Sequence, residues 1–321
     1  MSDWVRTGDP DALVRGLNGL LFFPVTAFGE NGRFKPEIYR QHIRTGIEGG
    51  AAAVFSCCGT GEFFALDVDD YAAALAVAVE EAAGRLPVVG GVGYGTALAR
   101  RYAQAAEQAG ADGLLVMPPY LVYAGQDGLR RHYSELADST RLALILYQRD
   151  NAILSPETVT DLSERPTVVG LKDGYGDLDH LHRIISGLRA ATGLRTSAKE
   201  LLYLNGMPTA EMTQPAYRAL GVNVYSSAAY CFAPNIAMAF WKAISTGDDA
   251  TVRALVDAFY TPLVRLRDQG SGYAVSLVKA GVRMQGLDVG PVRAPLAEPA
   301  REHVEQLARL VEAGNRVVRD L

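Results

Sequence analysis

The stretch that decides the fold reads VVGLKDGYGD and runs from Val168 to Asp177. A short apolar run ends in Lys172, and a glycine-rich acidic turn follows at once. This pattern predicts a buried strand with the lysine at its carboxyl end. Burial there would lower the pKa of the amine and free its lone pair to attack a carbonyl. An ion pair of Lys172 with Asp173 or Asp177 explains this stretch equally well, so both interpretations stay open on the segment alone.

The same strand pattern recurs along the chain, alternating with helical segments. The sequence predicts eight strands, at residues 19–25, 51–56, 86–92, 113–117, 142–147, 168–172, 201–206 and 222–226. Continuous apolar strands that alternate with helices are typical of an α/β fold with a parallel (β/α)8 barrel, the TIM barrel. An open doubly wound sheet is the competing fold. It usually has a phosphate-binding loop after its first strand, and Phe23-Pro24-Val25-Thr26 is not such a loop.

The pattern predicts three parts: an N-terminal arm at residues 1–16, a catalytic barrel at 17–233, and a C-terminal helical extension at 234–321. Within the extension, helices are expected at residues 236–245, 250–268, 273–285 and 299–319. That is more helix than one barrel needs for closure. Apolar helices outside a complete barrel often cover a subunit interface.

Composition narrows the class of protein and its partners. The 321 residues carry a formal net charge of −5 without a dense basic run, which argues against nucleic acid as a partner. Cys57, Cys58 and Cys231 have neither the number for a disulfide framework nor zinc-site spacing. The first ten residues are polar and acidic, unlike a secretory signal, and the apolar run 17–28 is too short to span a membrane. A soluble cytoplasmic protein with reduced thiols and no membrane contact is the expectation.

In a βα barrel the active site lies at the carboxyl ends of the strands. Lys172 and Tyr147 end consecutive predicted strands, and a phenol can move protons while a lysine forms an imine. The Gly59-Thr60-Gly61 loop offers backbone N–H groups that can approach a carboxylate closely. A loop-capping hydroxyl for Tyr147 and a plain glycine turn remain the alternatives. No His, Asp or Glu cluster with metal-ligand spacing follows these strands, so no metal is expected.

Four motifs in this order resemble the dihydrodipicolinate synthase/N-acetylneuraminate lyase superfamily: Gly59-Thr60-Gly61-Glu62, Pro119-Tyr120, Tyr147, and Gly170-Leu171-Lys172-Asp173 with Gly176-Asp177. The likeness covers about residues 17–320. It implies a TIM barrel in which Lys172 forms a covalent Schiff base, Tyr147 shuttles protons, and no other cofactor takes part. It also implies that Gly59 and Thr60 hold an α-keto carboxylate, and that the protein is a homotetramer built from dimers.

Further motifs resemble one branch of the superfamily, at residues 147–152, 171–174, 207–211, 225–227 and 272–281. The activity that this resemblance implies is dehydration and decarboxylation of 5-dehydro-4-deoxy-D-glucarate to 2,5-dioxopentanoate, in the catabolism of glucarate and galactarate. The second carboxylate of such a keto sugar diacid calls for a cation or hydrogen-bond donors. Arg149 is the best placed cation, with Asn151 and Ser227 as helpers, and Gly206 completes the expected substrate-binding set. A salt bridge of Arg149 to Asp150 or Asp173 is the alternative.

Two departures from the superfamily pattern bear on mechanism. Gly59 stands where synthases and lyases carry a threonine, so a hydroxyl relay through that position to Tyr147 is unavailable. Tyr120, at the position of a relay tyrosine, is therefore given only a supporting role, and Gln148 replaces an expected asparagine. Two other functions stay open: a pyruvate-dependent aldolase or synthase, and an inactive barrel that binds keto acids as a sensor.

Overall fold

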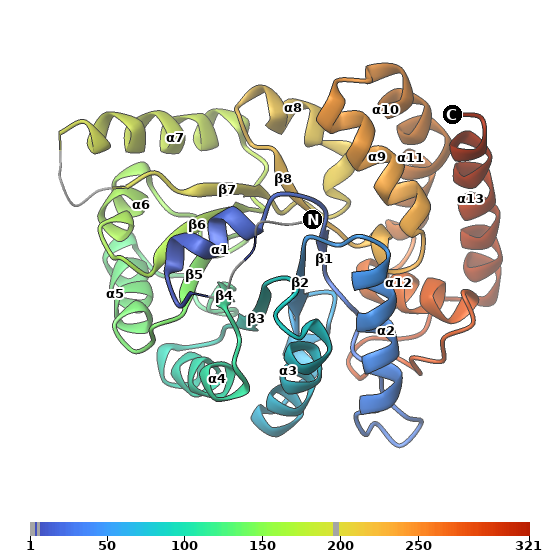
Figure 1. Cartoon of the computed structure of the whole chain (residues 1–321), viewed down its shortest axis with the longest axis horizontal. Coiled ribbons are helices and arrows are strands. Elements are labelled where there is room, and N and C mark those ends of the chain that lie inside the picture. The colour runs from blue at the N-terminus through green and yellow to red at the C-terminus, as the bar shows by residue number, and fades with distance from the viewer. Residues whose placement is uncertain (1–3, 5–6, 195–198) are drawn as a thin grey trace.

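A computed structural model of the chain describes Trp4, residues 7–194 and residues 199–321. Its centre is a closed parallel barrel in which neighbouring strands follow one another from the first to the eighth (Figure 1). The strands are β1 (Leu21–Phe22), β2 (Ala53–Ser56), β3 (Val88–Val92), β4 (Gly113–Val116), β5 (Ala143–Gln148), β6 (Val168–Asp173), β7 (Leu202–Asn205) and β8 (Val224–Ser227). The predicted TIM barrel is confirmed, and each predicted strand overlaps an observed one.

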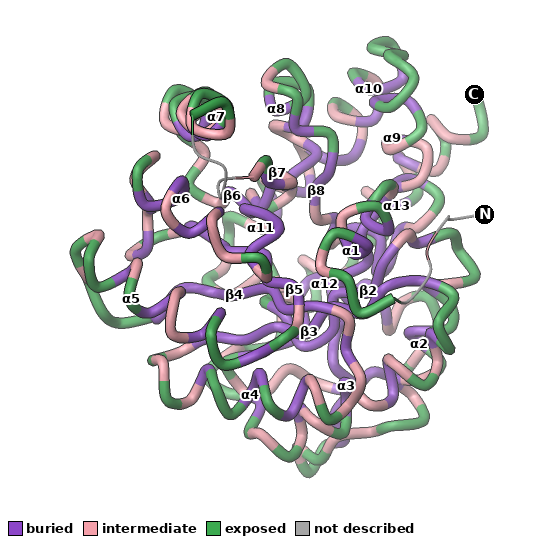
Figure 2. The backbone as a smooth tube through the Cα atoms, turned by 60° about the vertical axis from the view of Figure 1, so that its left-hand side comes forward, coloured by how far each residue is buried: buried purple, intermediate pink, exposed green. Residues whose placement is uncertain are grey.

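Helices surround the barrel and cover the outer face of the strands. They are α2 (Pro36–Glu48), α3 (Val68–Ala82), α4 (Thr96–Ala109), α5 (Gln126–Ala137), α6 (Pro156–Ser163), α7 (Leu178–Thr192) and the unpredicted α8 (Gln214–Ala219), with short 3-10 turns η1 (Phe63–Ala65) and η2 (Ala210–Met212). Every residue of β4, β5 and β6 is buried, as Figure 2 shows for the centre of the molecule. Parallel strands that are covered on both faces have continuous apolar sequences, which is why they could be predicted from the sequence.

The described part of the N-terminal arm contains a helix that the sequence did not predict. It is α1 (Pro10–Gly16), which begins with Pro10 in its first turn after the Asp9 cap. Leu13 is only 1% exposed, and a Cβ on Gly113, the first residue of β4, would lie 2.5 Å from its Cδ2. The helix therefore covers the amino ends of the strands, on the side of the barrel away from Lys172.

The C-terminal extension lies beside the barrel, with α13 at its outer edge (Figure 1). Its elements are η3 (Ala229–Cys231), α9 (Pro234–Thr246), α10 (Asp249–Leu255), a π-helical turn η4 (Val256–Tyr260), α11 (Thr261–Arg267), α12 (Tyr273–Met284) and α13 (Arg301–Arg319). The single helix expected at 250–268 is thus three segments. Pro262 lacks the N–H that a continuous α-helix needs at that point, and π-turns relieve such interruptions. One hydrophobic core runs from the barrel into the extension, because Phe240, Phe259 and Leu307 belong to the same cluster as the strands.

Candidate active site

Lys172 lies in a cavity of about 360 Å³ at the carboxyl ends of the strands. The side chain is 5% exposed, and its Nζ lies 4.4 Å from the ring centroid of Phe23 and 4.5 Å from that of Tyr147. Burial lowers the pKa of Lys172 to about 8; Cys58 opposes this shift and the positive charge of Arg149 adds to it. The amine is therefore much closer to its neutral, nucleophilic form at physiological pH than an ordinary lysine.

The alternative interpretation, an ion pair of Lys172 with Asp173 or Asp177, is wrong, because neither pair forms. The Asp173 carboxylate accepts hydrogen bonds from Gln148 Nε2 (2.8 Å), from the Tyr217 hydroxyl and from two backbone N–H groups of the following turn. Asp177 caps α7 through the backbone N–H of His180. Both carboxylates are thus occupied by neutral donors, and Gln148, the departure from the expected asparagine, is one of them.

Tyr147 pairs with Lys172 in the register of β5 and β6, as expected for residues that end consecutive strands. Its hydroxyl donates to the carbonyl oxygen of Gly206 at 3.0 Å. Burial raises the pKa of Tyr147, and the nearby Arg149 guanidinium opposes that rise. Close approach requires glycine here: a Cβ on Gly206 would lie 2.7 Å from Lys172 Cε, and one on Gly174 would lie 2.8 Å from the Tyr147 ring.

The loop after β2 presents unused hydrogen-bond donors to the same cavity. Gly59 and Thr60 both line it, and within the described chain their backbone N–H groups donate to no backbone oxygen and no side chain. The loop is flanked by Cys57 (φ 55°) and Glu62 (φ 57°), two non-glycine residues in the left-handed region. Such strained residues gather at ligand sites when the surrounding structure holds them. The geometry fits the carboxylate-binding role expected for Gly59 and Thr60.

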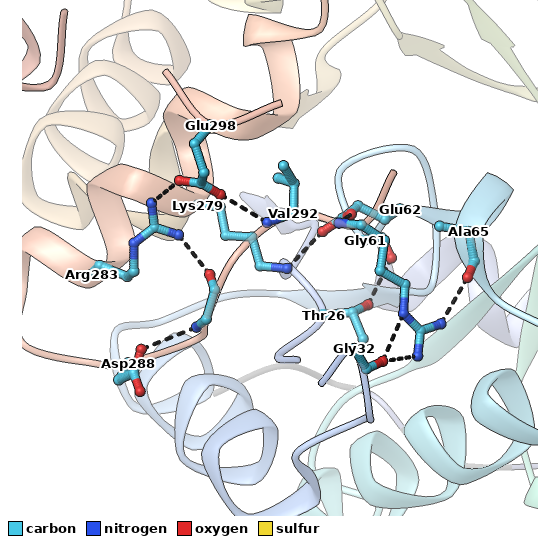
Figure 3. Close-up of polar contacts among 12 residues, drawn as sticks. Thr26, Gly32, Gly61, Glu62, Ala65, Lys279, Arg283, Asp288, Val292 and Glu298 are labelled. Carbon is cyan, nitrogen blue, oxygen red and sulfur yellow. Dashed lines mark hydrogen bonds and ion pairs between the residues drawn. The ribbon is translucent and has the colours of Figure 1, made fainter. Parts of the chain in front are cut away.

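A buried ion pair holds this loop against the C-terminal extension, as Figure 3 shows. Lys279 Nζ of α12 donates to Glu62 Oε1 at 2.7 Å, and both side chains are fully buried. Glu62 Oε2 accepts the backbone N–H of Arg293 at 2.8 Å, while the Arg293 guanidinium binds the carbonyl oxygens of Gly32 and Ala65. Gly61, which precedes Glu62, accepts a hydrogen bond from the Thr26 hydroxyl on its carbonyl oxygen at 2.7 Å.

The other predicted substrate-binding residues are distributed unequally around the cavity. Arg149 lines it, and its Nε is paired with Asp150 Oδ2 at 2.9 Å, so the alternative salt bridge does form. Asn151 is absent from the cavity wall, because its amide donates to the carbonyl oxygens of Pro119 and Val122. Ser227 is fully buried behind the wall, where its hydroxyl donates to Glu211 Oε1 at 2.6 Å.

Tyr120 lies on the cavity wall at the border with solvent, and it is 36% exposed. Burial of its hydroxyl raises the pKa of Tyr120 to about 12. Leu121, Val122 and Tyr123, which follow it, are 100%, 55% and 90% exposed. The loop held by Asn151 therefore displays apolar side chains directly beside the cavity mouth.

Several cavity residues were missed at the level of sequence. Glu211 lies fully buried on the wall. Burial raises the pKa of its carboxyl to about 7, although the hydrogen bond from Ser227 acts to lower it. Its Oε2 has no hydrogen-bond partner among the described residues. Glu211 lies in the recognised 207–211 motif, which could have drawn attention to it. Tyr273 and Arg267 come from the extension and also line the cavity. Tyr273 lies in the recognised 272–281 motif, whereas Arg267 has no local sequence signal.

Across the described residues, no group of three or more His, Cys, Asp or Glu side chains is placed to hold a metal ion. Cys57, Cys58 and Cys231 are free and buried thiols. In the same part of the chain, no helix combines the length and the apolar character that crossing a membrane requires. Catalysis without a metal, or without a cofactor beyond the Schiff base, stays a prediction.

A closed (β/α)8 barrel with a buried lysine and a phenol on adjacent strand ends defines the class of lysine-dependent barrel lyases. Comparison with known families agrees with this class. The model of the dihydrodipicolinate synthetase family matches residues 16–314, and the chain belongs to this family.

Curated relatives cover nearly the whole chain. A probable 5-dehydro-4-deoxyglucarate dehydratase 1 of Streptomyces coelicolor is 60% identical over 94% of this chain and 95% of its own length. A probable 5-dehydro-4-deoxyglucarate dehydratase of Rhizobium rhizogenes is 42% identical over 92% and 95%. The crystal structure of dihydrodipicolinate synthase from Bacillus clausii superposes with a TM-score of 0.83 at 24% identity, over 94% of this chain and 99% of that one. That structural likeness bears on the fold.

Proposed function

We propose that this chain is a decarboxylating dehydratase that converts 5-dehydro-4-deoxy-D-glucarate to 2,5-dioxopentanoate, water and CO₂. The observation that carries the proposal is the buried, unpaired Lys172 amine beside the Tyr147 phenol, in a chain 60% identical to a relative named for this substrate. No observation favours the pyruvate-dependent aldolase or the keto-acid sensor over this reading.

The first half of the reaction is dehydration. The neutral Lys172 amine adds to the ketone carbon, and loss of water from the resulting carbinolamine leaves an iminium, with Tyr147 carrying the protons. The iminium acidifies the adjacent methylene. Removal of a methylene proton gives an enamine, which expels the β-hydroxyl as a second water after that group takes up a proton. Gly59 and Thr60 hold the carboxylate next to the imine carbon through their unused N–H groups.

The second half is decarboxylation. Loss of the β-hydroxyl leaves an unsaturated iminium conjugated toward the far end of the substrate. The bond to the distal carboxylate breaks, CO₂ leaves, and the electron pair moves through the conjugated chain to the iminium nitrogen. Protonation and hydrolysis then release 2,5-dioxopentanoate and restore the Lys172 amine. One electron sink serves both bond cleavages.

Two measurements on the purified protein test this function. Incubation with 5-dehydro-4-deoxy-D-glucarate is expected to release CO₂ and an aldehyde in equal amounts, and Lys172→Met is expected to release neither. Borohydride reduction during turnover should convert the imine to a stable secondary amine, so that the peptide with Lys172 gains the mass of the substrate, or of a later intermediate, less one water plus two hydrogens. Carbon–carbon bond formation with pyruvate and no CO₂ release would favour the aldolase. Binding of keto acids that survives in Lys172→Met, with no turnover by the wild type, would favour the sensor.

The expected homotetramer and cytoplasmic location stay part of the proposal. The exposed side chains of Leu121, Val122 and Tyr123 support association at the cavity mouth, because large apolar side chains gather on surfaces that meet a partner. Sedimentation of the full-length protein measures the assembly directly. A monomer at micromolar concentration would contradict it.

A further inference from the structure

A second cation faces the cavity from the C-terminal extension. Arg267 ends α11, lines the cavity wall, and has a side chain that is 20% exposed. Its Nη1 donates to the hydroxyl of Thr209 at 2.9 Å, and its Nε and Nη2 donate to Asp268 Oδ1 at 3.0 and 2.9 Å. A guanidinium carries five N–H donors in a fixed fork. Three are used here, so one N–H on each Nη is left for a ligand.

The partner that holds Arg267 is itself in an unusual conformation. Thr209 has φ 56°, and the left-handed region is unfavourable for a β-branched residue. A conformation of this kind persists when neighbouring contacts hold it, and it is most often found at ligand sites. Thr209 also lines the cavity. The strained turn after β7 therefore presents its hydroxyl to the guanidinium at the point where both reach the cavity.

Topology places Arg267 apart from the loop expected to hold the keto end of the substrate. Gly59 and Thr60 follow β2, which lies opposite β6 and Lys172 in the closed ring of strands. Thr209, which anchors Arg267, follows β7 on one side of Lys172, whereas Arg149 follows β5 on the other. Two cations thus flank the reacting amine, and either could face the second carboxylate.

The charges around the two arginines distinguish them. Asp150, the partner of Arg149, lines the cavity as well, so its carboxylate opposes an incoming anion. Asp268, the partner of Arg267, is 60% exposed and is absent from the cavity wall. Arg267 therefore presents its cationic face to the cavity while its counter-ion stays in solvent.

We infer that Arg267, oriented by Thr209, binds the distal carboxylate of the diacid and sets the preference for a dicarboxylic over a monocarboxylic keto acid. This inference rests on the proposed function and replaces Arg149 as the residue for that carboxylate. Arg149 keeps a different role: its positive charge acts to lower the pKa of the Lys172 amine and of the Tyr147 phenol. A guanidinium fork suits a carboxylate in geometry and charge.

The kinetic signature follows from the chemistry. The contact is made by the bound substrate and is kept through imine formation and dehydration, so it stabilises the ground state and the transition states of these steps equally. Loss of the contact should therefore raise KM while leaving kcat nearly unchanged. Charge-assisted hydrogen bonds of this kind predict a rise in KM on the order of 100-fold.

The test compares Arg267→Met with Arg265→Met, which removes the same charge from an exposed position of the same helix. Arg267→Met should raise KM for 5-dehydro-4-deoxy-D-glucarate on the order of 100-fold and change kcat less than about tenfold. The concentration of pyruvate that half-saturates borohydride trapping at Lys172 should change less than about threefold, since pyruvate has one carboxylate. Arg265→Met should match the wild type in both assays. Arg267→Lys, which keeps the charge without the fork, should show an intermediate KM.

The outcomes are separable. Turnover by the wild type with an unchanged KM in Arg267→Met overturns this inference alone, and so does an equal loss of diacid turnover and pyruvate trapping. Retained pyruvate trapping also shows that the variant is folded. A 100-fold rise in KM in Arg149→Met but not in Arg267→Met returns the role to Arg149. If the wild type does not turn over the diacid, the proposed function fails and this inference fails with it.

Discussion

Replacing Lys279 by methionine should destabilise the protein strongly, because it leaves the Glu62 carboxylate buried without its cation. The two side chains are fully buried. Among the described residues, their other partners are the backbone N–H of Arg293 on Glu62 Oε2 and the ring of Phe28, 4.3 Å from Lys279 Nζ. Removing one member of a buried pair costs about 3–5 kcal/mol. Methionine has a similar length and keeps most of the packing, so the loss comes mainly from the charge.

The size of the effect can be expressed as a melting temperature. Unfolding entropy of roughly 2.1 cal/mol/K per residue over the 321 residues makes 1 kcal/mol worth about 1.5 °C. Lys279→Met is therefore expected to lower Tm by about 4–7 °C in scanning calorimetry. Lys35→Met is the matched control, because the pair of Lys35 with Asp288 is exposed, at 37% and 74%. Exposed pairs contribute little, so its Tm should stay within about 1.5 °C of the wild type.

The double variant Glu62→Gln/Lys279→Met separates charge from packing. If the buried charge causes the loss, the double variant should recover most of the stability, because no unpaired ion is left inside. Since Glu62 ends the Gly59–Glu62 loop, Lys279→Met should also lower kcat/KM for the diacid by about tenfold at temperatures below its transition. A Tm unchanged in Lys279→Met, or losses that simply add in the double variant, would refute the reasoning.

Three further predictions follow from the site. The pKa of Lys172 falls from 10.5 to about 8 on folding, so the wild type gains stability as pH rises between these values. At pH 7, Lys172→Met should therefore be more stable than the wild type by up to about 3 kcal/mol in denaturant unfolding. The same variant should have no activity. In the wild type, kcat/KM should rise with pH through about 8, as the amine becomes neutral. The pKa of Glu211 rises from 4.5 to about 7 on folding, so the wild type loses stability as pH rises between these values, because the carboxyl ionises first in the unfolded chain. The free energy of unfolding of Glu211→Gln should exceed that of the wild type by up to about 3 kcal/mol at pH 8 and by much less at pH 5. An equal difference at both pH values would contradict this assignment.

The barrel could be predicted because its determinants are local. Buried parallel strands such as β5 and β6 begin as continuous apolar runs and carry polar residues only at their carboxyl ends, and their spacing along the chain matches alternating strands and helices. The helix α1 was missed because it is seven residues long, too short for helical periodicity to stand out. Its position depends on Leu13 packing against Gly113, a contact between distant parts of the chain.

The same distinction separates the site residues. Lys172 and Tyr147 lie at the carboxyl ends of β6 and β5, and Gly59 and Thr60 follow β2. The rule that barrel sites lie at strand ends therefore places them together. That rule also selected Ser227 and could not tell that its hydroxyl turns behind the wall to Glu211. Arg267 follows no strand. It reaches the cavity because the packing of α11 against the other helices of the extension brings Leu263 and Arg267 to the wall, which depends on tertiary structure.

The charges of the cavity also suit the order of the reaction. Each arginine carries its own aspartate, so neither guanidinium adds an unpaired positive charge to the free site beside Lys172. In the proposed reaction, the dianionic substrate binds unused donors at both ends, on the loop of Gly59 and Thr60 and on Arg267. Departure of CO₂ removes the carboxylate from the Arg267 end and leaves a product with a single negative charge. The contact that selects the diacid is thus lost in the step that completes the chemistry, and release of the product does not require Arg267 to break an ion pair.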